Sequence, residues 1–214
     1  MNSPIPSLFV IGSSTTVLFG PYLKKMVEGV YRYSRKGEEP SEMAAALRDL
    51  DVPQGASAGD SSKVLEHLHS LDRAGGFHPD VVLIHVGAHD MKQDVETGRY
   101  QVPLGQYRLN VEQIVAWFQA RDIKLVWIRI GPLDETLHNA RSHSFHRFEK
   151  DLSDYNEAAE AILRRRAVPI LDLPGFTRSL GPMDEILKDH IHFKDEIVRP
   201  QAAYIAGYLS RMVD

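Results

Sequence analysis

Short runs of apolar residues, rich in Val and Ile, recur along the chain and end at Gly, Pro or Asp. Runs of this length and composition are typical of buried strands in a parallel sheet. A weaker run at 29–35, GVYRYSR, mixes polar and apolar residues and predicts a strand at the sheet edge. The buried strands are predicted at SLFVIG (7–12), DVVLIHVG (80–87), KLVWIRIG (124–131) and VPILDL (168–173).

Between these runs the apolar positions recur at intervals of three and four residues, which is the period of a helix with one buried face. Helical patterns occupy residues 21–30, 61–74, 103–122 and 148–167. The third pattern has a clear apolar stripe, made of Leu104, Tyr107, Val111, Ile114, Val115 and Phe118. The first helix is expected to begin near Pro21, with Thr15 and Thr16 capping it or supporting the preceding turn.

Strands that alternate with helices predict βαβ units with right-handed crossovers. We therefore expect an α/β fold, a three-layer α/β/α sandwich around a mostly parallel five-stranded sheet, formed by a single domain over residues 1–214. Ligands of such sheets bind at the carboxyl ends of the strands. The residues that follow each predicted strand are therefore the place to look for chemistry.

Composition narrows the classes of partner. The chain has 214 residues, of which 43% are hydrophobic and 25% charged, and its formal net charge is −4. These values are ordinary for a globular protein and argue against a nucleic-acid surface, so a small-molecule or glycan partner is expected. No apolar run approaches the roughly 18 residues that cross a bilayer, and the start MNSPIPSLFV has no signal-peptide pattern. We expect no membrane partner and a cytoplasmic location.

Polar groups gather after the predicted strands. Hydroxylated residues 13–16 follow Gly12, and Gly-Ala-His-Asp at 87–90 follows the second buried strand. GASAGDSS at 55–62 precedes a helix, and LKDHIHF places Asp189 three residues before His192. Because cysteine is absent, covalent catalysis would use oxygen or nitrogen. A hydroxyl, backbone donors and a carboxylate–histidine pair are the components of acyl transfer by a serine nucleophile.

Each component has a chemical reason. A serine hydroxyl needs a base at neutral pH, and the imidazole of His192 is suited to that task. Asp189 would hold the imidazole in one tautomer and stabilise its cation. Fixed donors that meet the developing oxyanion are each worth about 10²–10³ in rate. Gly59 lets a substrate oxygen approach a backbone N–H closely.

In this order the segments resemble the SGNH (GDSL-type) hydrolases. That family has G-D-S-x-T after the first strand, a glycine in a loop before a helix, G-x-N-D after the third strand, and a C-terminal D-x-x-H. The resemblance spans residues 9–193 and implies the flavodoxin-like sandwich of the family. It implies that Ser14 is the nucleophile, His192 the base and Asp189 its acidic partner.

The resemblance also implies an oxyanion hole formed by the backbone N–H groups of Ser14 and Gly59 and by the side chain of His89. The chain departs from the family pattern at Ser13, where Asp is usual, and at His89, where Asn is usual. A neutral imidazole can replace the amide donor. Branches of the family that carry G-x-H-D, FGPYL and GDSS are more similar to this chain, so His89 is interpreted as a substituted donor. The alternative is a structural pair with Asp90.

The segment GPLDETLHNARSHSFHRF at 131–148 is predicted to be a long polar loop at a strand end, and such loops are usually functional. Its composition suits hydrogen bonds to a sugar, a carboxylate or a phosphate. The alternative is a solvated lid without substrate contact. The candidate substrate contacts are Ser13, Asp90, His138, Arg141 and His143.

Ten histidines raise the possibility of a metal site. His85 and His89 would share a face only on a helix, whereas His85 lies in a strand pattern. Asp189, His190 and His192 do not complete a ligand set with familiar spacing. We therefore expect neither a metal nor a cofactor, and a metallohydrolase is a minor alternative.

The sequence predicts a serine esterase that removes a short acyl group, acetyl by preference, from a carbohydrate or similar polar substrate. A lipase, lysophospholipase or thioesterase with an apolar acyl channel is one alternative, and an acyltransferase using the same acyl-enzyme is another. From a different class, the chain could be a non-catalytic glycan-binding domain.

Overall fold

The computed structural model describes residues 4–213. The strands are β1 (Ser7–Gly12), β2 (Arg32–Arg35), β3 (Val81–His85), β4 (Gln93–Asp94), β5 (Lys124–Ile128), β6 (Phe145–His146) and β7 (Ile170–Leu171). The helices are α1 (Ser14–Met26), α2 (Pro40–Arg48), α3 (Ser61–Ala74), α4 (Leu104–Gln119), α5 (Glu135–Arg141), α6 (Glu149–Arg165), α7 (Leu173–Arg178), α8 (Met183–Ile186) and α9 (Asp195–Ser210).

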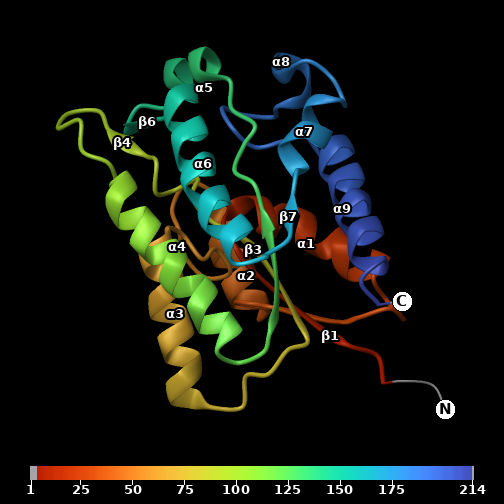
Figure 1. Ribbon diagram of the computed structural model, residues 1–214. Helices are drawn as coiled ribbons and strands as arrows, with labels where there is room; N and C mark the ends of the chain where they lie inside the picture. The colour runs from red at the N-terminus through yellow and green to blue at the C-terminus, as the bar shows by residue number, and fades with distance from the viewer. Residues whose placement is uncertain (1–3, 214) are drawn as a thin grey trace.

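A five-stranded parallel sheet in the order β2-β1-β3-β5-β7 forms the middle layer (Figure 1). The α/β sandwich and the edge position of β2 are confirmed. The registers align Leu8 with Val81 and Gly12 with His85, so β1 and β3 end side by side. The short pair β4 and β6 forms a separate antiparallel sheet that the hydrophobic pattern did not predict.

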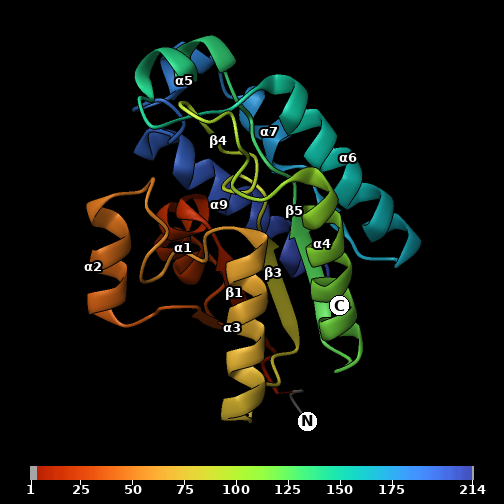
Figure 2. The ribbon, with the colours of Figure 1, turned by 90° about the vertical axis from the view of Figure 1, so that its left-hand side faces the viewer.

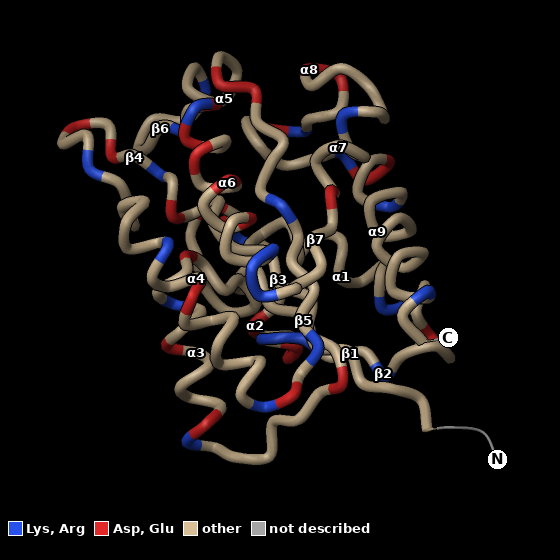
Figure 3. Tube along the Cα trace, in the orientation of Figure 1, with Lys and Arg blue, Asp and Glu red and all other residues tan. Residues whose placement is uncertain are grey.

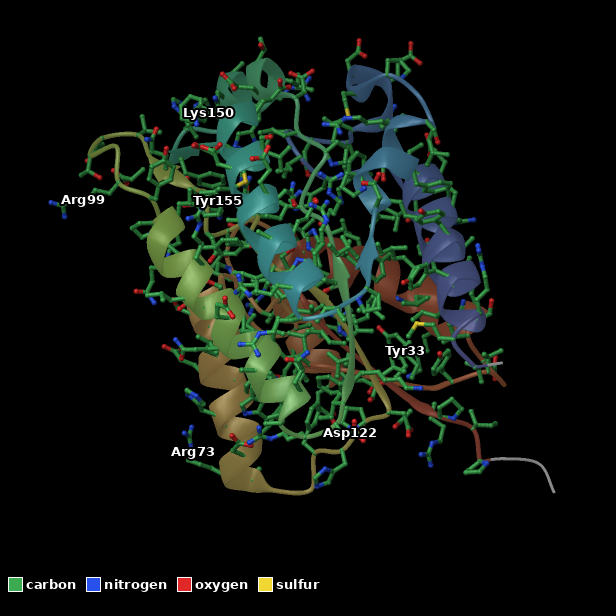
Figure 4. The ribbon with its side chains drawn as sticks, viewed as in Figure 1. Tyr33, Arg73, Arg99, Asp122, Lys150 and Tyr155 are labelled. Carbon is green, nitrogen blue, oxygen red and sulfur yellow. The ribbon has the colours of Figure 1, made fainter. Side chains whose placement is uncertain are left out.

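Helices cover both faces of the sheet (Figures 1 and 2). Along β1, Ile11 packs on the side of α3, α4 and α6, whereas Leu8 and Val10 pack on the side of α1 and α9. This alternation explains the continuous apolar runs, because strands buried on both faces need apolar residues at every position. Tyr155 of α6, labelled in Figure 4, packs on Tyr107 of α4 with ring centroids 5.0 Å apart.

Two sequence predictions were wrong in detail. The first helix begins at Ser14 and contains Pro21, because the Thr16 and Val17 N–H groups already bond to the Ser13 carbonyl. Thr15 and Thr16 therefore lie inside the helix, and neither caps it. The segment 131–148 is not one long loop, since it contains α5 and β6.

Basic and acidic residues are interleaved along the trace of the described residues (Figure 3), in keeping with the formal net charge of −4 of the full chain. None of the helices within residues 4–213 combines the length and the apolar character that a membrane crossing needs.

Candidate active site

Ser14 lies at the carboxyl end of β1, where the chain turns at once into α1. Glycine is required just before this turn, because a Cβ at Gly12 would lie 2.4 Å from Thr16 Cγ2 and 2.7 Å from the His85 carbonyl oxygen. The tight turn makes Ser14 the first residue of the helix. Its side chain therefore lies at a helix N-terminus, beside free N–H groups and the positive end of the dipole.

Ser14, His192 and Asp189 form a continuous hydrogen-bonded series across 178 residues of chain. Ser14 Oγ lies 2.8 Å from His192 Nε2, and His192 Nδ1 lies 2.9 Å from Asp189 Oδ2. The carboxylate accepts the Nδ1 hydrogen, which leaves Nε2 free to accept from the hydroxyl. The imidazole is only 5% exposed, so packing helps to hold this orientation.

The Asp189 carboxylate is fixed by backbone donors as well as by the imidazole. Its Oδ1 accepts from the N–H groups of Ile191 and His192 at 2.9 and 2.7 Å. Burial alone would raise the pKa of Asp189, but the His192 hydrogen bond and charge and these N–H groups hold the pKa well below its usual range. The Asp189 carboxylate is therefore ionised at neutral pH. Exposed Arg141 donates to the Asp189 carbonyl at 3.1 Å.

Two backbone N–H groups near Ser14 remain free. Among residues 4–213, neither the Ser14 nor the Gly59 N–H has a hydrogen-bond acceptor. Ala58 N–H donates to the Gly12 carbonyl at 2.8 Å, which holds the Gly59 loop against the end of β1. Gly59 has φ +72°, and a Cβ there would lie 2.8 Å from Pro53 Cβ, so this position also requires glycine.

His89 is buried in the loop after β3 and is 3% exposed. Burial, followed by the charges of Lys92 and Arg147, holds the pKa of His89 well below its usual range. The imidazole is therefore neutral and carries a single N–H. No described residue forms a hydrogen bond with its ring nitrogens, and the Asp90 carboxylate bonds elsewhere. His89 is thus available to a ligand.

Asp90 is buried in the loop after β3 and bonds to the start of α3. Its fully buried carboxylate accepts from the Ser61 N–H at 3.0 Å and from the Ser61 hydroxyl, and Asn110 donates to that hydroxyl at 2.8 Å. Burial raises the pKa of Asp90 to about 7, although the Ser61 hydrogen bonds oppose the shift. The structure places this side chain in the interior, joining the β3 loop to α3, and does not bring it to a substrate.

Ser13 also points inward. It is 2% exposed, and its Oγ lies 3.0 Å from His85 Nδ1. Burial lowers the pKa of His85 to about 4, so this imidazole is neutral. The pair joins the ends of β1 and β3 beneath Ser14, which is a structural position distinct from the substrate contact predicted for Ser13.

The three loop candidates have different positions. His138 is fully buried, with its Nδ1 2.9 Å from His190 Nδ1, and His190 Nε2 lies 2.8 Å from Asp51 Oδ2. Arg141 lies at the Asp189 turn, as described above, whereas His143 is exposed. Of the three, only Arg141 directly contacts a member of the Ser14 series.

Sequence reasoning missed Asp51, His190 and Arg147 as site residues. Arg147 is 3% exposed, and its Nε donates to the Ala88 carbonyl at 2.7 Å. It lines a cavity of about 30 Å³ together with Thr15, Ile191 and Phe193. For Arg147 the sequence signal was the polar composition of 131–148, which cannot indicate which residue turns inward. His190 was considered only as a metal ligand beside Asp189 and His192, and no pattern marked Asp51.

Within residues 4–213, no group of three or more His, Asp or Glu side chains is placed to hold a metal ion. The hydrogen bonds define a site made of a hydroxyl bonded to an imidazole that is bonded to a carboxylate, with free N–H donors beside the hydroxyl. Such an arrangement can activate the hydroxyl as a nucleophile and can stabilise an oxyanion.

Comparisons with known proteins identify the family and the fold of the chain. A family model described as "GDSL-like Lipase/Acylhydrolase family" matches residues 10–199. No curated protein matches the sequence significantly. Among solved structures, a lipase/acylhydrolase from Enterococcus faecalis is similar at 15% identity and TM-score 0.69, covering 97% of this chain and 96% of its own.

Two further solved structures have the same fold. The acetyl xylan esterase AlAXEase shares 14% identity at TM-score 0.68, covering 95% of this chain and 99% of its own. A GDSL-like lipase from Bacteroides thetaiotaomicron shares 14% identity at TM-score 0.64, covering 99% and 93%.

Proposed function

Because this chain belongs to the GDSL-like lipase/acylhydrolase family and is an ester-hydrolysing enzyme, we propose that it is a serine esterase for short-chain esters, acetyl by preference, of a carbohydrate or similar polar substrate. The observation that carries the proposal is the hydrogen-bonded series Ser14–His192–Asp189 at the carboxyl end of the sheet. Such a series, with free N–H groups beside the hydroxyl, has the components that acyl transfer needs.

In the first step His192 Nε2 takes the Ser14 proton while Oγ attacks the ester carbonyl carbon. The carbonyl oxygen becomes an oxyanion, which the N–H groups of Ser14 and Gly59 and the imidazole N–H of His89 meet. Asp189 stabilises the imidazolium that forms. The imidazole of His89 is neutral, which supports a role as a hydrogen-bond donor to the oxyanion and not as an acid that transfers its proton.

In the second step the tetrahedral intermediate collapses, the bond to the alcohol oxygen breaks, and His192 returns its proton to the leaving alcohol. The acyl group is then bonded to Ser14 Oγ. Water then attacks the acyl carbon while His192 Nε2 takes one of its protons. The second tetrahedral intermediate collapses, the bond between the acyl carbon and Ser14 Oγ breaks, and His192 returns the proton to Oγ. The acid is released and the free enzyme is regenerated, and no cofactor takes part.

The size of the cavity supports a short acyl group. The cavity lined by Thr15, Ile191 and Phe193 has a volume of about 30 Å³. A long acyl chain would need an extended apolar channel. A lipase or thioesterase would prefer long acyl chains, so p-nitrophenyl esters of increasing length separate the two proposals. A rate that increases beyond butyrate would exclude the short-chain esterase.

A polar alcohol part is supported by the surface next to His190. A hollow of about 610 Å³ there is lined by Asp49, Asp51, Lys92 and Gln101 among others, and Asp51 bonds directly to His190. Such a lining suits the hydroxyl groups of a sugar more than a lipid tail. The acetyl xylan esterase AlAXEase, which has the same fold, is in keeping with this substrate class.

The deciding experiment compares wild type with Ser14→Ala in p-nitrophenyl acetate hydrolysis, and measures intact mass after reaction with a fluorophosphonate. We expect wild-type turnover, loss of turnover in Ser14→Ala, and one adduct in wild type alone. Ser153→Ala is a matched control, because this hydroxyl lies on α6 and bonds only to Glu157. Equal turnover in Ser14→Ala would refute the serine mechanism.

Two further outcomes address the remaining alternatives. Faster transfer of the acyl group to an added sugar alcohol than to water would indicate an acyltransferase. Sugar binding without turnover of any ester would indicate a glycan-binding domain.

A further inference from the structure

One of the residues that line the cavity next to Thr15 is a buried cation, and it has no ion-pair partner among residues 4–213. Arg147, directly after β6, has its Nη1 buried with no hydrogen-bond partner among residues 4–213. Its Nε donates to the Ala88 carbonyl, and its guanidinium lies 4.8 Å from the centre of the Phe145 ring. No described carboxylate forms an ion pair with it.

This arrangement is costly in the free protein. A buried charge without a partner loses its hydration and recovers little of that free energy. Burial lowers the pKa of Arg147 to about 10, which still leaves the guanidinium protonated at neutral pH. Lys92 Nζ lies 4.0 Å from the same Phe145 ring, and burial lowers the pKa of Lys92 to about 7. The Asp51 carboxylate is near enough to raise the pKa of Arg147 but forms no hydrogen bond or ion pair with it, so Nη1 still lacks an acceptor.

The cavity is lined by chain neighbours of the reacting groups and not by Ser14 or His192 themselves. These neighbours are Thr15, which follows Ser14, and Ile191 and Phe193, which lie on either side of His192. The rest of the lining is mostly apolar, with Met91 and Leu152 among its members. At about 30 Å³ the cavity has room for one small group. A methyl group there would leave Arg147 Nη1 without a partner, whereas a carboxylate would give the guanidinium an anionic hydrogen-bond acceptor.

We propose that Arg147 binds a carboxylate of the substrate, so that the natural ester carries a carboxylate close to the ester bond that is cleaved. The planar guanidinium offers parallel donors that match a carboxylate, and the dry surroundings strengthen such a pair. The inference rests on the proposed serine esterase and names its substrate class. The carboxylate belongs either to the acyl group, as in a half-ester of a short dicarboxylic acid, or to the alcohol, as in an acetylated uronic acid. In the first case a short acyl group ending in a carboxylate fills the cavity in place of acetyl, and in the second the carboxylate of the alcohol fills it and the acetyl group lies outside.

Two pairs of esters separate these sources. On the alcohol side, 3-acetoxybenzoate is compared with 3-acetoxybenzamide, and on the acyl side, 4-nitrophenyl hydrogen glutarate with 4-nitrophenyl pentanoate. The readout is the ratio of kcat/KM within each pair, after subtraction of the rate with Ser14→Ala. We expect wild type to favour the carboxylate in one pair by about tenfold or more, as for a charge-assisted hydrogen bond.

Substitutions of Arg147 test whether its guanidinium causes the preference for the carboxylate ester. Arg147→Met should lower the ratio to about one or below, and Arg147→Lys should retain part of it, since it keeps the charge but loses the planar donors. Arg73→Met is the matched control, because Arg73 lies in the last turn of α3 (Figure 4), at the end of that helix far from Asp60 and the site, and should leave the ratio unchanged.

The wild-type ratio decides the question even if Arg147→Met does not fold. Turnover of the neutral esters with ratios near one in both pairs would overturn this inference and leave the serine esterase intact. Unchanged ratios in a folded Arg147→Met would also overturn it. Absence of turnover of all four esters, with no fluorophosphonate adduct, would instead refute the proposed function and this inference with it.

Discussion

Replacing Asp189 by Asn tests whether the carboxylate sets the tautomer of His192. Two backbone N–H groups point at Asp189 Oδ1, at 2.9 and 2.7 Å. The Asn amide must therefore place its oxygen there, and its NH₂ replaces Oδ2, which lies 2.9 Å from His192 Nδ1. A donor at that point favours the tautomer with the proton on Nε2, which cannot accept from Ser14.

The expected loss is large because the base is then in the wrong protonation state. Asp189→Asn should lower kcat/KM by about 10³- to 10⁴-fold, or roughly 4–5.5 kcal/mol of transition-state stabilisation. The assay is p-nitrophenyl acetate hydrolysis from pH 5 to 9. Asp184→Asn is the matched control, because its carboxylate lies on the neighbouring helix α8 and should leave the rate unchanged.

The same substitution has a stability signature with a defined sign. The folded-state pKa of Asp189 is depressed from 3.8, so ionisation stabilises the fold at neutral pH. This contribution is present above about pH 4 and is lost as the pH falls through the lower, folded-state pKa. The Tm difference between wild type and Asp189→Asn should therefore shrink below about pH 4. Activity within tenfold of wild type, with a Tm difference independent of pH, would refute the reasoning.

The remaining predictions concern the residues around Ser14. His89→Ala should lower kcat for p-nitrophenyl acetate by about 10²–10³-fold, whereas His89→Asn should recover most of it, and equal rates in both variants would exclude a donor role. Ser13→Ala should change kcat/KM less than tenfold, because its hydroxyl bonds only to His85; a large rise in KM would restore Ser13 as a substrate contact. Burial raises the pKa of Asp90 to about 7, so ionisation opposes folding, and the Tm of wild type relative to Asp90→Asn should fall from pH 5 to 7.5; a rise would reverse this sign.

Most of the candidate site residues could be predicted from the sequence, because each follows a strand or a recognisable turn. The apolar runs predicted the five parallel strands, and Gly59 marked a position where a substrate oxygen can approach the backbone closely. The spacing of Asp189 and His192 placed both on one turn, and the structure brings them to Ser14. The direction of Ser13 and Asp90 could not be predicted, because a residue after a strand can turn toward either the interior or the site.

Local pattern by itself determined the element types, their order and the polar segments that follow the strands, because these depend on periodicity and on steric limits within a few residues. Tertiary structure alone decided which polar side chains are buried. Asp51 and His190 meet across 139 residues, and Arg147 is enclosed because the segment carrying β6 folds over the loop after β3. Burial is a property of the packed chain, and the unpaired charge that it creates at Arg147 is therefore visible only once all the elements are assembled.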